Sequence, residues 1–508
     1  MLQSFTAENF RALNLSDEQL GKITVLCGAN SVGKSSILKS LLLIKQIDNE
    51  GDITHKVVPL KGSLVNLGDY KNLVKNHVTT EDVTIGFSAD FKPSRKTGID
   101  FGKCDKICYE LTLGFDEDDA DTTQAKTKLK RFYVEVSGSE EDGDLNWLEL
   151  KRMPKNRSDY VNFKNSSDSE EDYRFSGSIV TKADDESEKK TYLFTESDEI
   201  IVKSPFSDGL SIKTGALLGD DVRRAIDLFL TAIQTYSSIR AVMNKINYLG
   251  PIREIPVRYR DYGDTASQSV GIRGENAPYV LANSEKTIKS PWNVKEPDAP
   301  NETHTFVQGM DRILKDETNA WMRYLDCCDK VDCRKDNNYP GLITTKLTKS
   351  DLPCDFTDVG FGVGQVFPII VEGLLMDNDA TLFIEQPEVH LHPKMQGALT
   401  DFFIAQALSG KQFIIETHSD HIINRLVRRI VEDGLDGEAL GLANLVQIYF
   451  VKKNEDTKKV EFEPVKVNPE LGIVNWPSNF FDQNLREQQG IVHSAVLKKQ
   501  KKLREGGQ

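Results

Sequence analysis

Hydrophobic residues recur along this chain with two different periods, which predict where its strands and helices lie. Continuous apolar, β-branched runs predict buried strands over residues 23–27, 380–384 and 412–416. Alternating apolar and polar residues predict half-buried strands over residues 2–10, 83–87 and 132–136. Apolar residues at helical spacing predict helices over residues 36–45, 221–244 and 366–375. The strand and helix signals are strongest near the start of the chain and again after residue 345.

The pattern changes along the chain and predicts five segments. Residues 1–76 and 345–467 combine buried strands with helices. Residues 77–216 are rich in strand signals and hold most of the acidic runs, so we expect a β-rich insertion there. Residues 217–344 combine a short helical arm with a connector punctuated by Gly and Pro, and residues 468–508 form a C-terminal tail. A sustained heptad repeat is absent, so a long coiled-coil arm is excluded.

A glycine-rich loop joins the first buried strand to the first predicted helix. Residues 28–35 have the G-x-x-x-x-G-K-[ST] spacing of a phosphate-binding loop, in which glycines let successive N–H groups point at phosphate oxygens. Lys34 would meet the β- and γ-phosphates, and Ser35 would ligate Mg²⁺. We therefore expect ATP and Mg²⁺ as cofactors, bound by Asn30, Ser31, Val32, Gly33, Lys34, Ser35 and Ser36. The alternative is a glycine turn before an ordinary helix.

Composition limits the class of protein. The 508 residues are 39% hydrophobic, which is enough for a sizeable core. With 64 basic and 78 acidic residues the net charge is −14, so a global basic field for nucleic acid is excluded. The lysine cluster at 498–502 leaves local DNA contact open. The seven cysteines, without a leader peptide or a membrane-length apolar run, predict a cytoplasmic protein with reduced thiols and no membrane partner.

Two later strands end in residues suited to nucleotide chemistry. Residues 380–384 lead into carboxylates, which a rigid strand would hold at the edge of the sheet where a ligand lies. Residues 412–416 lead into a histidine that would sense the γ-phosphate or hold the attacking water. The catalytic residues we expect are Glu385, Gln386, Glu388 and His418, and the expected Mg²⁺ ligands are Ser35 and Glu385.

A second glycine-rich segment, residues 358–365, opens the predicted helix at 366–375. Its helix start offers a second anion-binding site, with Gly362, Gly364 and Gln365 as expected nucleotide ligands. Two phosphate-binding helix starts in one chain are explained by a head-to-tail dimer or a higher oligomer. In it, this segment of one subunit closes over the ATP held by the Lys34 loop of another.

These motifs, in this order, resemble the ABC-type ATPase heads of the SMC and OLD families. Closer still is the resemblance to small OLD-like ATPases of bacterial phage defence, as in Septu and beside some retrons. It rests on residues 384–388, 390–393 and 416–419, which read IEQPE, HLHP and ETHS, and on residues 248–253 and 472–482. The resemblance implies an α/β ABC-type head with a mixed sheet. It does not cover residues 77–216.

The end of the acidic strand departs from the family pattern. In ABC-type heads the acidic strand ends in Asp-Glu, and that Glu polarises the attacking water, whereas this chain has Glu385 and Gln386. Because glutamine cannot accept a proton, either Glu388 takes the role or hydrolysis is slow and ATP mainly holds a conformation.

Histidines and cysteines raise an alternative chemistry. Half of the eight histidines lie close together in the sequence, at positions 390, 392, 418 and 421, which raises the alternative of a transition-metal site. The resemblance instead implies that residues 390–393 lie at the dimer contact. The cysteines at 104, 108, 327, 328 and 333 lack paired C-x-x-C spacing, which favours free thiols over zinc.

The resemblance also implies partners and a function. The tail at 468–508 is shorter than a nuclease domain of about 100 residues, so we expect that the chain does not cut nucleic acid by itself. The resemblance to Septu-like ATPases implies that an HNH-type nuclease acts in trans. DNA or a retron RNA–DNA is a further candidate partner. The expected function is an ATP-binding and ATP-hydrolysing subunit of an anti-phage complex that controls this nuclease. The alternatives are a DNA repair or recombination ATPase and a nucleotide-gated scaffold with negligible turnover.

Overall fold

The computed structural model describes most of residues 1–91 and 238–475 and only part of the rest of the chain. The described residues are 1–29, 32–50, 58–91, 105–115, 127–137, 145–151, 159–164, 177–179, 191–194, 200–203, 212–214, 238–254, 257–262, 269–295, 304–339, 341–358, 360–435, 437–454, 460–475, 477, 493–494 and 496. Most of the predicted helical arm at 221–244 and the lysine cluster at 498–502 lie outside them, and residues 238–244 are largely helical.

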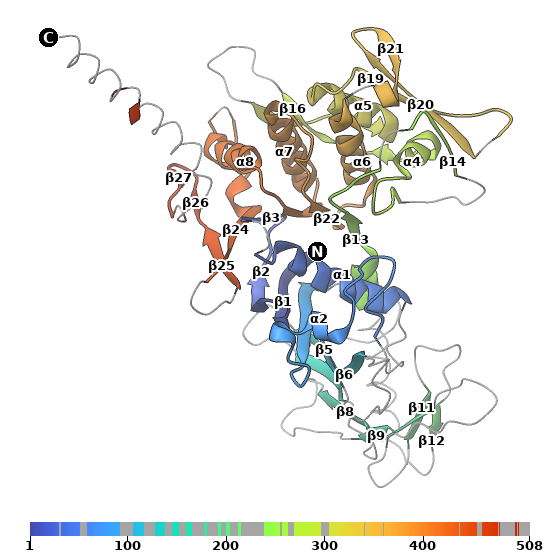
Figure 1. Ribbon diagram of the computed structural model, residues 1–508, viewed down its shortest axis with the longest axis vertical. Helices are drawn as coiled ribbons and strands as arrows, with labels where there is room; N and C mark the ends of the chain where they lie inside the picture. Colours follow the sequence, from blue (N-terminus) through green and yellow to red (C-terminus); the bar gives the residue numbers. More distant parts are fainter. Residues whose placement is uncertain are drawn as a thin grey trace.

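Among these residues, a six-stranded sheet forms the centre of the molecule (Figure 1). Its order is β13 (Ile246–Leu249), β22 (Thr381–Glu385), β23 (Gln412–Glu416), β3 (Ile23–Gly28), β24 (Val446–Lys453) and β25 (Val460–Val465). The first five strands are parallel, and β25 is antiparallel to β24. Strand β3, from the start of the chain, therefore lies between two strands from its later part.

Both faces of this sheet are buried, which explains its continuous apolar runs. Leu382 and Ile384 of β22 enter one core with the helices α6 (Phe361–Leu375), α7 (Pro393–Leu408) and α8 (Asp420–Glu432). Phe383 enters a second core with α1 (Lys34–Glu50) and another sheet. The central sheet is thus sandwiched between two apolar layers.

The second sheet is antiparallel and has eight described strands. Its order is β2 (Leu13–Gln19), β1 (Leu2–Phe10), β4 (Val83–Asp90), β5 (Lys106–Phe115), β6 (Thr127–Ser137), β7 (Leu145–Lys151), β8 (Asp159–Lys164) and β9 (Gly177–Ile179). Nearby, β10 (Thr191–Phe194), β11 (Ile200–Lys203) and β12 (Ile212–Thr214) form a separate sheet. Because β1 pairs with β4, this sheet crosses the predicted boundary between residues 76 and 77.

The predicted connector contains ordered structure of its own. Strand β13 belongs to the central sheet, and β14 (Tyr259–Asp261), β20 (Leu342–Lys349), β19 (Lys330–Lys335) and β21 (Leu352–Asp355) form a small sheet. The remaining described elements are α2 (Tyr70–Leu73), α4 (Ala277–Asn283), β15 (Thr287–Ile288), β16 (Trp292–Lys295), β17 (Thr305–Gln308), β18 (Arg312–Ile313), α5 (Leu314–Tyr324), β26 (Val467–Asn468) and β27 (Gly472–Ile473). The predicted α/β class with a mixed sheet is confirmed.

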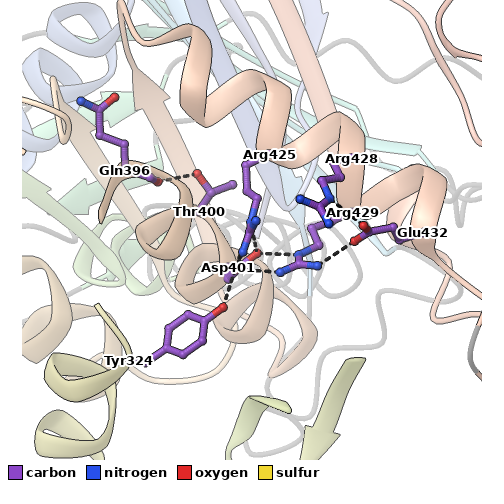
Figure 2. A network of polar contacts seen from close by, with 8 residues as sticks. All are labelled: Tyr324, Gln396, Thr400, Asp401, Arg425, Arg428, Arg429 and Glu432. Carbon is purple, nitrogen blue, oxygen red and sulfur yellow. Dashed lines mark hydrogen bonds and ion pairs between the residues drawn. The ribbon is translucent and has the colours of Figure 1, made fainter. Parts of the chain in front are cut away.

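A buried network of charged side chains joins three of the helices (Figure 2). The Asp401 carboxylate of α7 is fully buried and accepts hydrogen bonds from Arg425 and Arg429 of α8 and from the Tyr324 hydroxyl of α5. Arg429 also donates to Glu432 at 2.7 Å. Burial alone would raise the pKa of Asp401, but the hydrogen bonds from the two arginines outweigh it and hold that pKa below its ordinary value.

Candidate nucleotide site

Three parallel strands bring the predicted motifs to one edge of the central sheet. Strand β3 leads into the glycine loop, β22 into the acidic turn, and β23 into the histidine. The strand register places Glu385 opposite Glu416, and Glu416 opposite Leu26. Because carboxyl ends of parallel strands meet at one edge, segments distant in sequence form a single site there.

The glycine loop begins where only a glycine fits. Gly28 has a φ of +137°, and a Cβ atom at this position would lie 2.2 Å from the Val451 carbonyl oxygen. Gly33 has a φ of +110°, and its carbonyl accepts the Ser36 N–H at 2.9 Å as α1 begins. Val32 is half-buried, and Asn30 and Ser31 lie outside the described residues. The loop therefore has the sharp turns that the sequence spacing predicts.

Lys34 is buried inside this loop. Its ammonium donates to the carbonyl oxygens of Gly28, at 3.0 Å, and Ala29, at 2.6 Å. Burial lowers the pKa of Lys34, while the nearby carboxylates of Glu416 and Glu388 act in the opposite direction. The single cation of the loop thus lies beside two acidic side chains.

Ser35 contacts an acid that the sequence analysis did not assign. Its hydroxyl donates to Glu416 Oε1 at 2.8 Å. The other oxygen, Glu416 Oε2, is buried and has no hydrogen-bond partner among the described residues. Burial, reinforced by the nearby Glu385, raises the pKa of Glu416 to about 7. This carboxylate is therefore placed where a bound cation would stabilise its charged form.

Glu385 ends β22 and pairs with a tyrosine on the neighbouring strand. The Tyr248 hydroxyl of β13 donates to Glu385 Oε1 at 2.8 Å. Burial raises the pKa of Glu385, and the hydrogen bond from Tyr248 partly offsets that effect. No described hydrogen bond joins Glu385 to Ser35, so among the described contacts Glu416 is the acid that Ser35 meets.

The remaining predicted catalytic residues lie in the turn after β22 and at the end of β23. Gln386 has a φ of +47°, and its N–H donates to the Glu416 carbonyl at 2.8 Å. Glu388 Oε1 accepts the backbone N–H of His418 at 2.7 Å, and within the described part of the chain the buried Glu388 Oε2 has no partner. Burial, and then the charge of Lys34, lowers the pKa of His418. These residues lie together beside Lys34.

The second glycine segment lies at the start of α6. A Cβ atom on Gly362 would come within 2.6 Å of the His390 carbonyl, so this helix packs closely on the turn after β22. Gly364 lines a small cavity with Phe367 and Pro368 of the same helix. Gln365 is buried and accepts the Arg253 N–H at 3.4 Å. Among the described residues, no hydrogen bond joins this segment to the Lys34 loop.

Comparison with known protein families decides the class of this site. A profile described as an AAA ATPase domain matches residues 1–423. The chain belongs to the AAA ATPase domain family. A second profile, of a protein family of unknown function named DUF3696, matches residues 443–489 of this ATPase. The predicted ATPase domain is thereby confirmed.

Two solved structures are similar to this ATPase. The SMC head domain from Thermotoga maritima is 9% identical, with 92% of this chain and 99% of that chain covered and a TM-score of 0.34. A SmcHead bound to the C-winged helix domain of ScpA is 10% identical, with 92% and 98% covered and a TM-score of 0.38. A comparison with curated proteins gives no match.

The alternative of metal binding by histidine and cysteine has little support among the described residues. No cluster of three or more His, Cys, Asp or Glu side chains there is arranged to hold a metal ion. His392 instead caps α7 by accepting the Lys394 N–H. The described cysteines are free thiols. None of the described helices of this ATPase has both the length and the apolar character needed to cross a membrane.

Sequence reasoning missed three residues of the site: Glu416, Tyr248 and Arg253. A signal for Glu416 was present, because two apolar strands each end in Glu and parallel neighbours align their ends. The sequence includes Tyr248 and Arg253 only in the segment 248–253 that carries the resemblance and gives them no role. Their place beside the acidic turn depends on the pairing of β13 with β22, which joins strands far apart in the sequence.

Proposed function

We propose that this ATPase domain binds Mg²⁺ and ATP at the carboxyl edge of the central sheet and hydrolyses the nucleotide. The observation that carries the proposal is the pair of buried carboxylate oxygens beside the Lys34 ammonium, one from Glu416 and one from Glu388. Buried polar atoms without a partner are costly, and a site that receives a cation and a water would satisfy both.

Ser35, Glu385 and Glu416 fit a magnesium ion. Mg²⁺ prefers oxygen ligands and is held in proteins by one or two carboxylates, with phosphate oxygens and water completing the shell. When bound, it supplies the positive charge that offsets the triphosphate. The predicted ligand Glu385 is retained in this assignment, and Glu416 is added because it already contacts the Ser35 hydroxyl.

The remaining side chains divide the work of hydrolysis. Lys34 and the backbone N–H groups of its loop bind phosphate oxygens. Glu388 accepts a proton from the attacking water through Oε2, since its other oxygen is held by the His418 N–H. Gln386 orients this water, and His418 meets the γ-phosphate. Of the two candidates for the general base, Glu388 and Gln386, only Glu388 can accept a proton.

We infer that the glycine segment of α6 serves the nucleotide of a second copy. Phe361 at its start is 46% exposed, and a Cβ atom on Gly360 would meet no atom within 4 Å. The first residues of this helix are therefore open to an incoming phosphate, with the backbone N–H groups of Phe361 and Gly362 as the donors, whereas Gly364 is buried. A head-to-tail dimer or higher oligomer would bring it to the Lys34 loop of the partner.

We also propose that ATP switches an anti-phage assembly that controls a separate HNH-type nuclease. Support comes from the IEQPE, HLHP and ETHS motifs and from their resemblance to OLD-like defence ATPases. The measurement is phage plating on cells that carry this gene with and without a neighbouring nuclease gene. Protection that needs both genes is the expected result, while tight DNA binding without such a neighbour favours a repair ATPase.

The hydrolysis proposal is tested by steady-state ATP turnover. We expect the wild-type rate to exceed that of Lys34→Ala at least about tenfold, since phosphate positioning needs this cation. Glu388→Gln is expected to bind ATP normally but to turn over at least about tenfold more slowly. A wild-type rate no higher than that of Lys34→Ala would establish the nucleotide-gated scaffold instead.

A further inference from the structure

Arg253 is a buried cation in a position that the proposed chemistry does not use. It follows β13 and is 1% exposed, and its Nε has no hydrogen-bond partner in the portion of the chain that the structure describes. Burial lowers the pKa of Arg253 to about 10, so the group remains charged at neutral pH. No ion pair joins it to a carboxylate within the described part of the chain. A buried charge without a described ion-pair partner is a candidate for a functional role.

The guanidinium holds the acidic turn by its backbone. Its NH2 group donates to the Glu385 carbonyl at 2.9 Å, and its NH1 group donates to the Gln386 carbonyl at 3.4 Å. Gln386 has the left-handed φ noted above, which a non-glycine residue keeps only when its surroundings fix it. Arg253 binds the carbonyl of Gln386, and the N–H of Gln386 donates to the Glu416 carbonyl.

The backbone of Arg253 is hydrogen-bonded to a residue near the start of α6. Its N–H donates to Gln365 Oε1, and the Nε2 of the buried Gln365 has no partner among the residues described. The same helix start packs on the His390 carbonyl through Gly362. A shift of α6 along its axis therefore changes the contact with Arg253 and, through it, the turn that carries Gln386 and Glu388.

We propose that Arg253 is a positioning residue that couples the start of α6 to the Glu385–Glu388 turn, so that hydrolysis responds to the position of α6. The described hydrogen bonds of Arg253 reach Gln365 and the carbonyls of Glu385 and Gln386, so Arg253 acts through the turn. This inference rests on the proposed function, because the turn must carry the hydrolytic groups for its position to matter.

The test separates binding from turnover in four variants. Arg253→Met keeps the length of the side chain but not its donors, Arg253→Lys keeps the charge, and Gln365→Met removes the helix contact. Arg323→Met is the control, since Arg323 lies on α5, is exposed and donates to the Asp329 carbonyl at 2.9 Å. The dissociation constant for ATP, kcat and the thermal midpoint are measured for each.

We expect Arg253→Met to lower kcat about 10- to 100-fold while changing the dissociation constant for ATP less than about threefold. Arg253→Lys and Gln365→Met should lose less, about 3- to 10-fold, and the double variant Arg253→Met with Gln365→Met should be no slower than Arg253→Met. If Arg253→Met does not fold, Arg253→Lys with Gln365→Met carries the same comparison.

Two results overturn the inference while leaving the proposed function intact: Arg253 variants with wild-type kcat, or multiplicative losses in the double variant. A loss of ATP affinity equal to the loss of kcat would also contradict it, because it would indicate a role in binding. Wild-type turnover at the Lys34→Ala level would instead overturn the proposed function and the inference together.

Discussion

Replacing Asp401 with Asn is expected to lower the free energy of unfolding by about 3 to 5 kcal/mol, the usual cost of removing one partner from a buried ion pair. The carboxylate is the shared acceptor for Arg425, Arg429 and Tyr324. Asn preserves the volume but leaves Arg425 without its negative partner and the buried Arg429 with Glu432 alone. Urea denaturation at neutral pH, followed by circular dichroism, measures the change.

The control for this variant is an exposed ion pair. Asp326 contacts Lys394 at 3.2 Å, with side chains 64% and 74% exposed. Asp326→Asn should therefore cost about 0 to 1 kcal/mol. Equal losses in the two variants would show that the buried network contributes nothing beyond an ordinary surface pair.

The same network predicts a pH dependence. Because the pKa of Asp401 is lower in the folded state than in the unfolded chain, its contribution is present above the unfolded value, about 3.9. That contribution is lost as pH falls through the lower folded value. The difference in stability between the wild type and Asp401→Asn should thus be constant from about pH 8 to 5 and shrink below about pH 4. A difference that grew on acidification would contradict the assignment.

Glu416→Gln is expected to weaken Mg²⁺ binding by at least about 100-fold while leaving the metal-free protein at least as stable as the wild type. The affinity falls because a neutral amide cannot offset a divalent cation at the Ser35 hydroxyl. Stability does not fall, because Glu416 faces Glu385 across the strand register and both carboxylates are buried. Titration calorimetry with Mg²⁺ and a nonhydrolysable ATP analogue, together with metal-free thermal unfolding, checks both parts.

A matched control uses another buried acid. Glu372 on α6 is 4% exposed, and its Oε2 accepts the Val270 N–H. Glu372→Gln should leave Mg²⁺ affinity unchanged. If Glu416→Gln bound Mg²⁺ as the wild type does, Glu385 would be the acid that serves the ion and our assignment of Glu416 would be wrong.

The part of this site that could be predicted from the sequence is the part encoded locally. The phosphate loop, the acid at the end of β22 and the histidine after β23 each follow a buried strand, so residue type and spacing were sufficient. Glu416, Tyr248 and Arg253 act through neighbours that only the sheet order defines. For the same reason the sequence could not show that β1 joins β4, because antiparallel pairing between distant strands leaves no periodic signal.

The order of the central sheet has a consequence for biosynthesis. Strand β3 is synthesised first, whereas its two neighbours, β23 and β24, begin only at residues 412 and 446. The phosphate loop and its helix therefore leave the ribosome long before the strands that flank β3 exist. Contacts of such long sequence separation form slowly and leave apolar strands exposed in the meantime. We expect the nascent chain to depend on chaperones, and the nucleotide site to mature only after β24 has been made.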